Sequence, residues 1–181
     1  MTFKAVVYCS NTGHAKRYAE AFAKETGLPL VEASKAKKEL REGDRVVYFG
    51  WLMAGKIQGF ENAWKRFDVP VACSVGLYPD SERFREYVGR NNILIDVDYY
   101  HLRGGITPEK LKGPAKILMN IMMRTIRAKI EKKQDVTDEE RAMLAAYEEA
   151  ADFVDLSALE PVLARYRALC AADEAAQEEK R

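Results

Sequence analysis

Short hydrophobic runs alternate with amphipathic stretches in the first half of the chain. Residues 3–9, 45–51 and 69–75 are almost continuously apolar and rich in Val, Tyr, Phe and Ala. A run of this kind is typical of a strand that is buried on both faces, as in a parallel sheet. A weaker run at 28–33, which contains a proline, and another at 93–97 complete a set of five predicted strands.

Helical periodicity fills the gaps between these strands. Between residues 15 and 23, apolar side chains recur at the i, i+3, i+4, i+7 spacing, and Gly27 is placed to end that helix. The same spacing recurs at 60–67, and residues 81–89 can form a third helix with Phe84, Tyr87 and Val88 facing inward. This alternation implies βαβ crossovers and predicts an α/β fold with a doubly wound parallel sheet.

The alternation stops after the fifth predicted strand. Residues 103–133 carry no strand pattern and form a predicted helical insertion. Thr137 and Ser157 each stand three residues before a Glu, the capping-box pattern that begins a helix, so two C-terminal helices are expected within 137–172. Because the chain has the length of one domain, we expect residues 1–181 to form a single domain.

The composition argues against several classes of protein. The chain has 29 basic and 28 acidic side chains, a net charge of +1, which argues against a globally basic nucleic-acid binder. The charge is uneven, since residues 109–133 hold 8 basic and 2 acidic side chains and residues 134–181 hold 5 and 13. No uncharged run reaches the ~20 residues of a membrane span. Three cysteines without C-x-x-C spacing argue against a disulfide framework or a metal site and favour a cytoplasmic location.

The segment between the first strand and the first helix reads Tyr-Cys-Ser-Asn-Thr-Gly-His-Ala-Lys. Small and hydroxylated residues let main-chain N–H groups converge on an anion there, and the helix N-terminus adds about half a positive charge. The segment is neither a Walker loop nor a Rossmann fingerprint, and the alternative is a plain strand–helix turn. His14 either donates to the phosphate or lies in solvent. The predicted phosphate-binding residues are Ser10, Asn11, Thr12, Gly13, His14 and Ala15.

Two further segments leave the third and fourth predicted strands at the same edge of the sheet. Ligands of open α/β sheets bind at the carboxyl ends of the strands, where the strand order reverses. Gly55 and Gly76 permit a close approach of the backbone to a ligand, and Trp51 either packs on that ligand or closes the core. The residues predicted to line a ligand site at this edge are Trp51, Leu52, Met53, Ala54, Gly55, Val75, Gly76 and Leu77.

The order of these motifs resembles a known family. Ser-Asn-Thr-Gly-His-Ala at 10–15 resembles the flavodoxin loop that holds the phosphate of FMN, with Ala15 in place of the usual Thr and one hydroxyl contact fewer. Segments 99–111 and 117–124 resemble the insertion of the flavodoxin-domain subfamily that contains menaquinone-dependent protoporphyrinogen oxidase. The resemblance covers most of residues 1–130. It implies a three-layer sandwich around a five-stranded parallel sheet of order 2-1-3-4-5, with the flavin ring held by the segments at 51–55 and 75–77. It also implies noncovalent FMN, an oxidoreductase whose flavin carries the chemistry, and a small-molecule or protein redox partner such as a quinone or porphyrinogen.

Two other functions stay open. One is an electron-transfer flavodoxin acting as a shuttle, although such shuttles are usually strongly acidic and this chain is nearly neutral. The other is a flavodoxin-fold binding module that has lost FMN, an alternative that Ala15 keeps open. His101 and Arg103, just past the fifth predicted strand, either bind a substrate carboxylate such as a porphyrin propionate or have a structural role.

The predicted insertion has a basic amphipathic pattern. An apolar stripe follows it, surrounded by Lys and Arg: Ile117, Leu118, Ile121, Met122 and Ile126. Such a helix can lie peripherally on the inner face of an anionic membrane, through residues 109–133, or in the groove of a partner. The alternative is that it packs on its own domain with its cations paired to the acidic C-terminal third. Its methionines also suit an adaptable apolar pocket.

Overall fold

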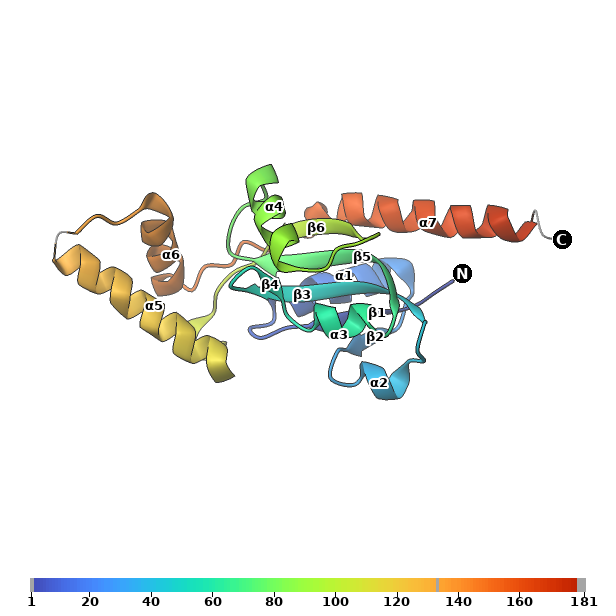
Figure 1. The fold of residues 1–181 in the computed structure, drawn as a ribbon, viewed down its shortest axis with the longest axis horizontal. Coiled ribbons are helices and arrows are strands. Elements are labelled where there is room, and N and C mark those ends of the chain that lie inside the picture. The colour runs from blue at the N-terminus through green and yellow to red at the C-terminus, as the bar shows by residue number, and fades with distance from the viewer. Residues whose placement is uncertain (1, 133, 179–181) are drawn as a thin grey trace.

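The computed structural model of the protein describes residues 2–132 and 134–178. At its centre lies a twisted sheet whose main path is parallel throughout (Figure 1). The neighbours along this path are, in spatial order, β2 (Leu30–Glu32), β1 (Phe3–Cys9), β3 (Arg45–Met53), β5 (Asp68–Gly76) and β6 (Asp98–Arg103). The carboxyl ends of these strands therefore meet at one edge of the sheet.

The sheet has six strands, so the predicted count of five is wrong. The additional strand, β4 (Lys56–Ile57), pairs antiparallel with the end of β3 and stands off the main path. The predicted strand at 93–97 is also wrong. Asp96 has φ of +57° and lies in a turn with Ile95, which is 66% exposed, and the edge strand is instead the next segment, β6. A left-handed residue interrupts extended pairing, which the apolar pattern alone does not reveal.

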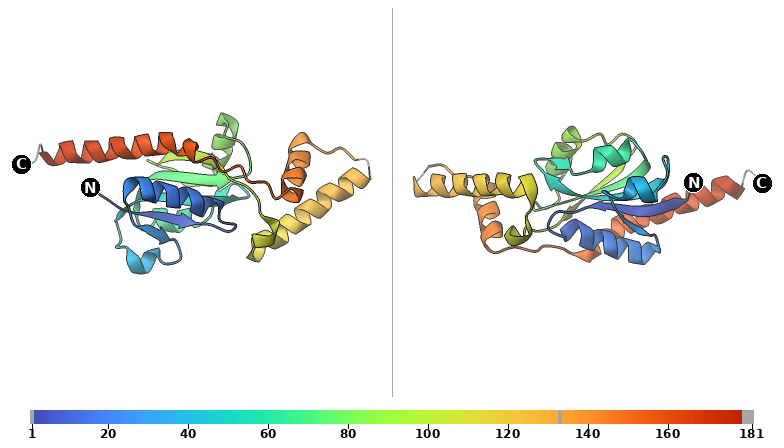
Figure 2. Two further views of the ribbon diagram at one scale, coloured as in Figure 1. Left: turned by 180° about the vertical axis from the view of Figure 1, so that it is seen from behind. Right: turned by 90° about the horizontal axis from the view of Figure 1, so that it is seen from below.

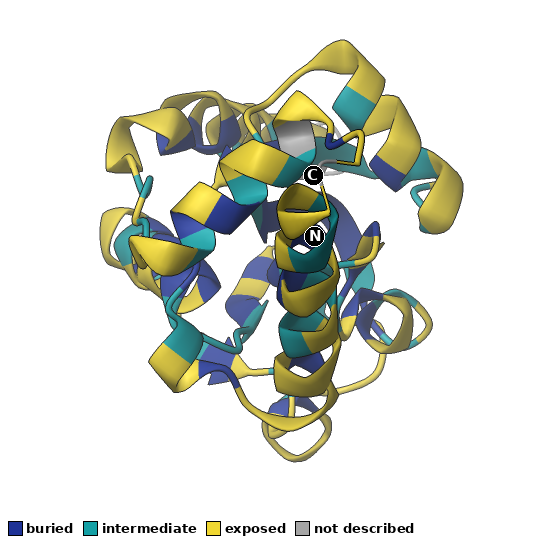
Figure 3. Ribbon diagram, turned by 90° about the vertical axis from the view of Figure 1, so that its left-hand side faces the viewer, coloured by how far each residue is buried: buried dark blue, intermediate teal, exposed yellow. Residues whose placement is uncertain are grey.

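Helices cover both faces of the sheet and make three layers (Figure 2). Alternate side chains of β3 enter the two cores: Val47 and Phe49 contribute to one, Val46 and Tyr48 to the other. Figure 3 shows the buried residues gathered on the sheet and on the inner faces of the helices. The first core is covered by α1 (His14–Thr26) and α7 (Glu160–Glu178), and the second by α2 (Ala36–Glu39), α3 (Phe60–Trp64) and α4 (Glu82–Asn91).

Two of the three helix ends predicted from the sequence are confirmed, and the third is wrong. Gly27 ends α1 in the left-handed conformation, with φ of +69°, as expected. Thr137 forms the predicted capping box with Glu140. The box predicted at Ser157 is wrong, because the Asp155 carboxylate accepts from the Ser157 N–H and O–H and caps the 3-10 helix η2 (Leu156–Leu159), which precedes α7.

Helices α5 (Gly113–Glu131) and α6 (Asp138–Glu148) form an arm beyond the carboxyl ends of the strands (Figures 1 and 2). A short 3-10 helix, η1 (Pro108–Lys110), leads into this α5–α6 arm, and Gly105 pairs with Asp152 where the chain enters and leaves it. The arm has its own small core: Met123, Ile126, Val136 and Leu144. Within the described residues, none of the helices combines the length and apolarity needed to cross a bilayer.

Candidate functional site

A cavity of about 470 Å³ lies where the carboxyl ends of β1, β3 and β5 face the α5–α6 arm. This is the edge at which open α/β sheets bind their ligands, and the volume falls within the usual range of ligand pockets. Of the predicted cofactor residues, all but Gly13 line this cavity. They are Ser10, Asn11, Thr12, His14, Ala15, Trp51, Leu52, Met53, Ala54, Gly55, Val75, Gly76 and Leu77.

One wall of the cavity is the turn from β1 into α1. Gly13 has φ of +102°, a conformation that disfavours any residue with a Cβ, and its N–H donates to the Ser10 hydroxyl oxygen at 3.1 Å. Gly13 is also the N-cap of α1, and the helix has no side-chain cap. The N–H groups of the first turn, which follow this glycine, therefore keep their capacity to bind an acceptor. Ala15 in that turn is 1% exposed, so this turn is shielded from bulk solvent.

His14 is buried, so the expectation that its side chain lies in solvent is wrong. Its Nδ1 lies 2.9 Å from the Thr12 hydroxyl, and its Nε2 lies 3.9 Å from a carboxylate oxygen of Asp152. Burial lowers the pKa of His14 and outweighs the opposing effect of Asp152. At neutral pH the ring is uncharged, so the N-terminus of α1 is the main positive feature of this wall.

Asn11 connects the same turn to the arm. Its side-chain amide donates to the carbonyl of Lys112 at 3.3 Å, and its side-chain oxygen accepts from the N–H of Lys112 at 3.1 Å. Lys112 is the residue before α5. The side chain therefore positions the start of the arm, a role that sequence reasoning missed because the two residues are 101 positions apart.

The second wall is a tight hairpin at the end of β3. Leu52 pairs with Ile57 and Met53 with Lys56, which leaves a turn of two residues. Both have positive φ, +50° at Ala54 and +77° at Gly55, as in the turns that suit a twisted hairpin. Glycine is required at the second position because an added Cβ would lie 2.8 Å from the ring of Tyr87. Tyr87 was expected to face the core, but it is 48% exposed and lines the cavity.

The third wall is the end of β5 with the start of the next loop. A Cβ at Gly76 would lie 3.1 Å from Leu52 and 3.2 Å from His101, so the glycine permits the close approach of these neighbours. The N–H of Gly104 donates to the Gly76 carbonyl at 2.6 Å and continues the pairing beyond β6. The remaining lining residues on this side were not predicted: Tyr78, Phe84, Gly105 and Ile106.

The arm closes the cavity with an apolar wall. Met119 and Met122 of α5 lie there with Met143 of α6, in agreement with the pocket alternative for these methionines, whereas Met123 is buried inside the arm. Methionine side chains adapt their shape to an apolar ligand. The other lining residues on this side are also apolar: Leu111, Ala115 and Leu118.

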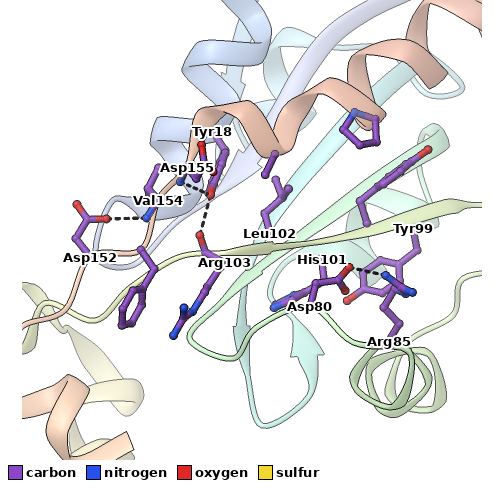
Figure 4. Close-up of a pocket in the computed structure, with 14 residues that line it drawn as sticks. Tyr18, Asp80, Arg85, Tyr99, His101, Leu102, Arg103, Asp152, Val154 and Asp155 are labelled. Carbon is purple, nitrogen blue, oxygen red and sulfur yellow. Dashed lines mark hydrogen bonds and ion pairs between the residues drawn. The ribbon is translucent and has the colours of Figure 1, made fainter. Parts of the chain in front are cut away.

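His101 and Arg103 do not line this cavity. They lie in a groove of about 830 Å³ along β6, between α4 and the segment that follows the arm (Figure 4). His101 is buried, with Nδ1 2.7 Å from the Ser74 hydroxyl and Nε2 2.9 Å from the Tyr78 carbonyl. Because a carbonyl only accepts, Nε2 carries the proton, and Nδ1 accepts from Ser74. Burial lowers the pKa of His101, so the ring is neutral and occupied by structural hydrogen bonds.

The two arginines that line the groove already have contacts within the fold. The Arg103 guanidinium lies 3.7 Å above the ring of Phe153, and its Nε donates to the Leu77 carbonyl at 3.3 Å. Arg85 pairs with Asp80, as Figure 4 shows. These contacts hold the Arg103 guanidinium against the fold, as the structural alternative for Arg103 expects.

Neither a metal site nor an activated thiol stands out. The described residues contain no cluster of His, Cys, Asp or Glu that could hold a metal ion. Cys73 is fully buried, and burial raises the pKa of its thiol, as it does for Cys9. Both thiols therefore stay protonated at neutral pH and are poor nucleophiles.

Comparison with known proteins adds no assignment. No protein-family model matches the chain, and no curated protein matches its sequence.

Proposed function

We propose that the chain has a flavodoxin-like fold, binds FMN noncovalently in the cavity between the strand ends and the α5–α6 arm, and acts as a flavin-dependent oxidoreductase. The observation that carries the proposal is the convergence of three strand-end turns on one cavity that has two chemically different ends. One end offers the uncapped first turn of α1, and the other offers aromatic and apolar side chains. FMN has the matching polarity, since an anionic phosphate tail is joined to a flat, largely apolar ring.

The residues present fit this group. The first-turn N–H groups of α1 and the hydroxyls of Ser10 and Thr12 would hold the phosphate. Trp51 and the hairpin residues after it, with the end of β5, would hold the ring. FMN, when bound, supplies reversible electron or hydride transfer.

The chain's own part would be to bind, orient and exclude water. The walls of the cavity bear no cluster of charges that would draw water to the ring, and the methionines of the arm close its outer side. The buried ring of His14 is neutral, so it adds no positive charge beside the phosphate. The phosphate would depend on main-chain donors, which makes its binding sensitive to any added negative charge.

The apolar outer wall favours a small-molecule redox partner over a large acidic or basic protein surface. By the resemblance of segments 99–111 and 117–124 to the protoporphyrinogen-oxidase subfamily, a quinone or porphyrinogen is our candidate partner. In the groove, His101 is neutral and hydrogen-bonded to Ser74 and Tyr78, and the Arg103 guanidinium stacks on the Phe153 ring. Within this proposal a quinone therefore fits the cavity better.

Titration of the purified protein with FMN, followed by quenching of flavin fluorescence, tests the site. Thr12→Asp places a carboxylate beside the phosphate. Two unit charges 5 Å apart at an effective dielectric of 20 repel by about 3 kcal/mol, so FMN should bind at least about 100-fold more weakly. Ser34→Asp is the matched control, because Ser34 is exposed in the loop after β2 and does not line the cavity. Equal FMN affinity in both variants would place the phosphate elsewhere.

A further inference from the structure

The outward face of α5 carries a ridge of large apolar side chains. Ile117, Leu118 and Ile121 are 65%, 48% and 57% exposed. Ile117 and Ile121 are four residues apart and therefore neighbours on the helix surface. On the opposite face, Met123 and Ile126 are already buried in the core of the arm. The apolar stripe predicted from the sequence is thus divided between two faces of α5. No other part of residues 2–132 and 134–178 covers the α5 ridge, which consists of Ile117, Leu118 and Ile121.

Cations surround the ridge. Lys116 and Arg124 are exposed beside it, and neither takes part in an ion pair within residues 2–132 and 134–178. Cations further along α5 are used differently, since they pair with glutamates of α6: Arg127 with Glu148 and Lys129 with Glu140. The expected pairing of the insertion with the acidic C-terminal third therefore neutralises the far half of α5 and leaves the half that bears the ridge positive.

We propose that the α5 ridge docks on an anionic lipid bilayer. Ile117 and Ile121 enter the boundary between headgroups and acyl chains, while Lys116 and Arg124 lie over the lipid phosphates. Exposed apolar side chains flanked by cations on one helix face are the pattern of interfacial helices. Anionic lipid supplies both the apolar medium and the negative charge that this face lacks.

The shape and charge of the face favour a bilayer over the other two occupants. A second copy of the chain in a two-fold interface would bring the same cations together, and like charges oppose that contact. A partner protein would need a groove that receives a protruding helix, whereas a bilayer deforms around one. Figures 1 and 2 show α5 at the end of the molecule, clear of the sheet, where an extended surface can reach it.

Docking would bring the candidate cavity to the lipid surface. Leu118 belongs to the ridge and also lines the cavity, and Ala115, Met119 and Met122 line the cavity from the same helix. The proposal does not depend on FMN, because the ridge and its cations are present whatever occupies the cavity.

Co-sedimentation with vesicles tests the proposal on the full chain. Vesicles of phosphatidylcholine with about 40% phosphatidylglycerol are compared with phosphatidylcholine alone at about 0.1 M salt. We expect binding to the anionic vesicles and little to the neutral ones. Each cation near an anionic surface contributes about fivefold in affinity, so Lys116→Gln with Arg124→Gln should weaken binding about 25-fold. The matched control is Lys37→Gln with Lys38→Gln, two exposed lysines of α2, which should bind like the unaltered chain.

The apolar contribution has its own pair of variants. Ile117→Ser with Ile121→Ser removes two side chains that do not line the cavity, and it should weaken binding at least tenfold. Ile95→Ser, at an isoleucine of similar exposure outside the arm, should have no effect. Equal binding to both vesicle types, equal loss in test and control variants, or no binding by a folded chain would each overturn the proposal. A dimer in the absence of lipid that the Ile117→Ser, Ile121→Ser chain no longer forms would also overturn it, in favour of a second copy on the ridge.

Discussion

Asn11 connects the candidate phosphate turn to the α5–α6 arm, and its replacement should loosen the arm. Its side chain makes one hydrogen bond to each main-chain group of Lys112, at 3.3 and 3.1 Å. A hydrogen bond contributes about 0.5–1.5 kcal/mol, and these two are open to solvent on one side. Asn11→Ala should therefore lower the free energy of local opening at the start of α5 by about 1–2 kcal/mol, while the global free energy of unfolding changes less.

Hydrogen–deuterium exchange measures this effect directly. A loss of 1–2 kcal/mol corresponds to exchange about 5–30-fold faster for the first turns of α5. Asn11→Asp retains the acceptor for the Lys112 N–H but sets a carboxylate against the Lys112 carbonyl, so its effect should be at least as large. Asn91→Ala is the control, because the Asn91 side-chain amide donates a hydrogen bond to the carbonyl of Tyr87 within α4, away from the arm. Unchanged exchange in α5 of Asn11→Ala would refute the reasoning and show that apolar contacts alone hold the arm.

Two further predictions concern stability. The Tyr18 hydroxyl donates to the Arg103 carbonyl at 2.7 Å and accepts from the Asp155 N–H at 2.9 Å (Figure 4). Tyr18→Phe should therefore lower the free energy of unfolding, measured by urea denaturation, by about 1–2 kcal/mol. An unchanged denaturation midpoint would contradict this. The second concerns His14 and His101, the two histidines of the chain, whose pKa values are lowered mainly by burial. Their contribution is complete above the ordinary pKa near 6.5 and is lost as pH falls through the lowered folded values, so stability should fall as the pH is lowered below about 6.5. The His14→Gln, His101→Gln chain should show a flatter profile in that window, and an equal slope in both chains would contradict the prediction.

The parts of the fold that sequence predicts are those with a local cause. The strands β1, β3 and β5 are apolar on both faces because helices cover both sides of the sheet, and that double burial is visible in the residues themselves. Gly27 and Thr137 end and begin helices through contacts within a few residues. The strand-end segments therefore lie where the sequence predicted them, and their predicted residues other than Gly13 line one cavity.

Features that depend on distant partners were missed or misplaced. The strand at 98–103 carries Asp, His and Arg, yet it forms the sheet edge, because the His101 ring is satisfied by Ser74 and Tyr78. Tyr87 lines the cavity and not the core, because Gly55, which lacks a side chain, leaves room for the Tyr87 ring. Ser157 lost its capping role to the nearby Asp155, a stronger acceptor. The contacts of His101 and Tyr87 depend on the fold that brings distant partners together, whereas Asp155 lies two residues from Ser157 and competes with it locally.

The visible absorption spectrum of the purified full-length chain tests the central claim most directly. We predict a flavin spectrum, with one FMN per chain released on heating, or the same stoichiometry after reconstitution with FMN. A correctly folded chain that stays colourless and fails to bind added FMN would contradict the account, and the cavity would then belong to a binding module without flavin.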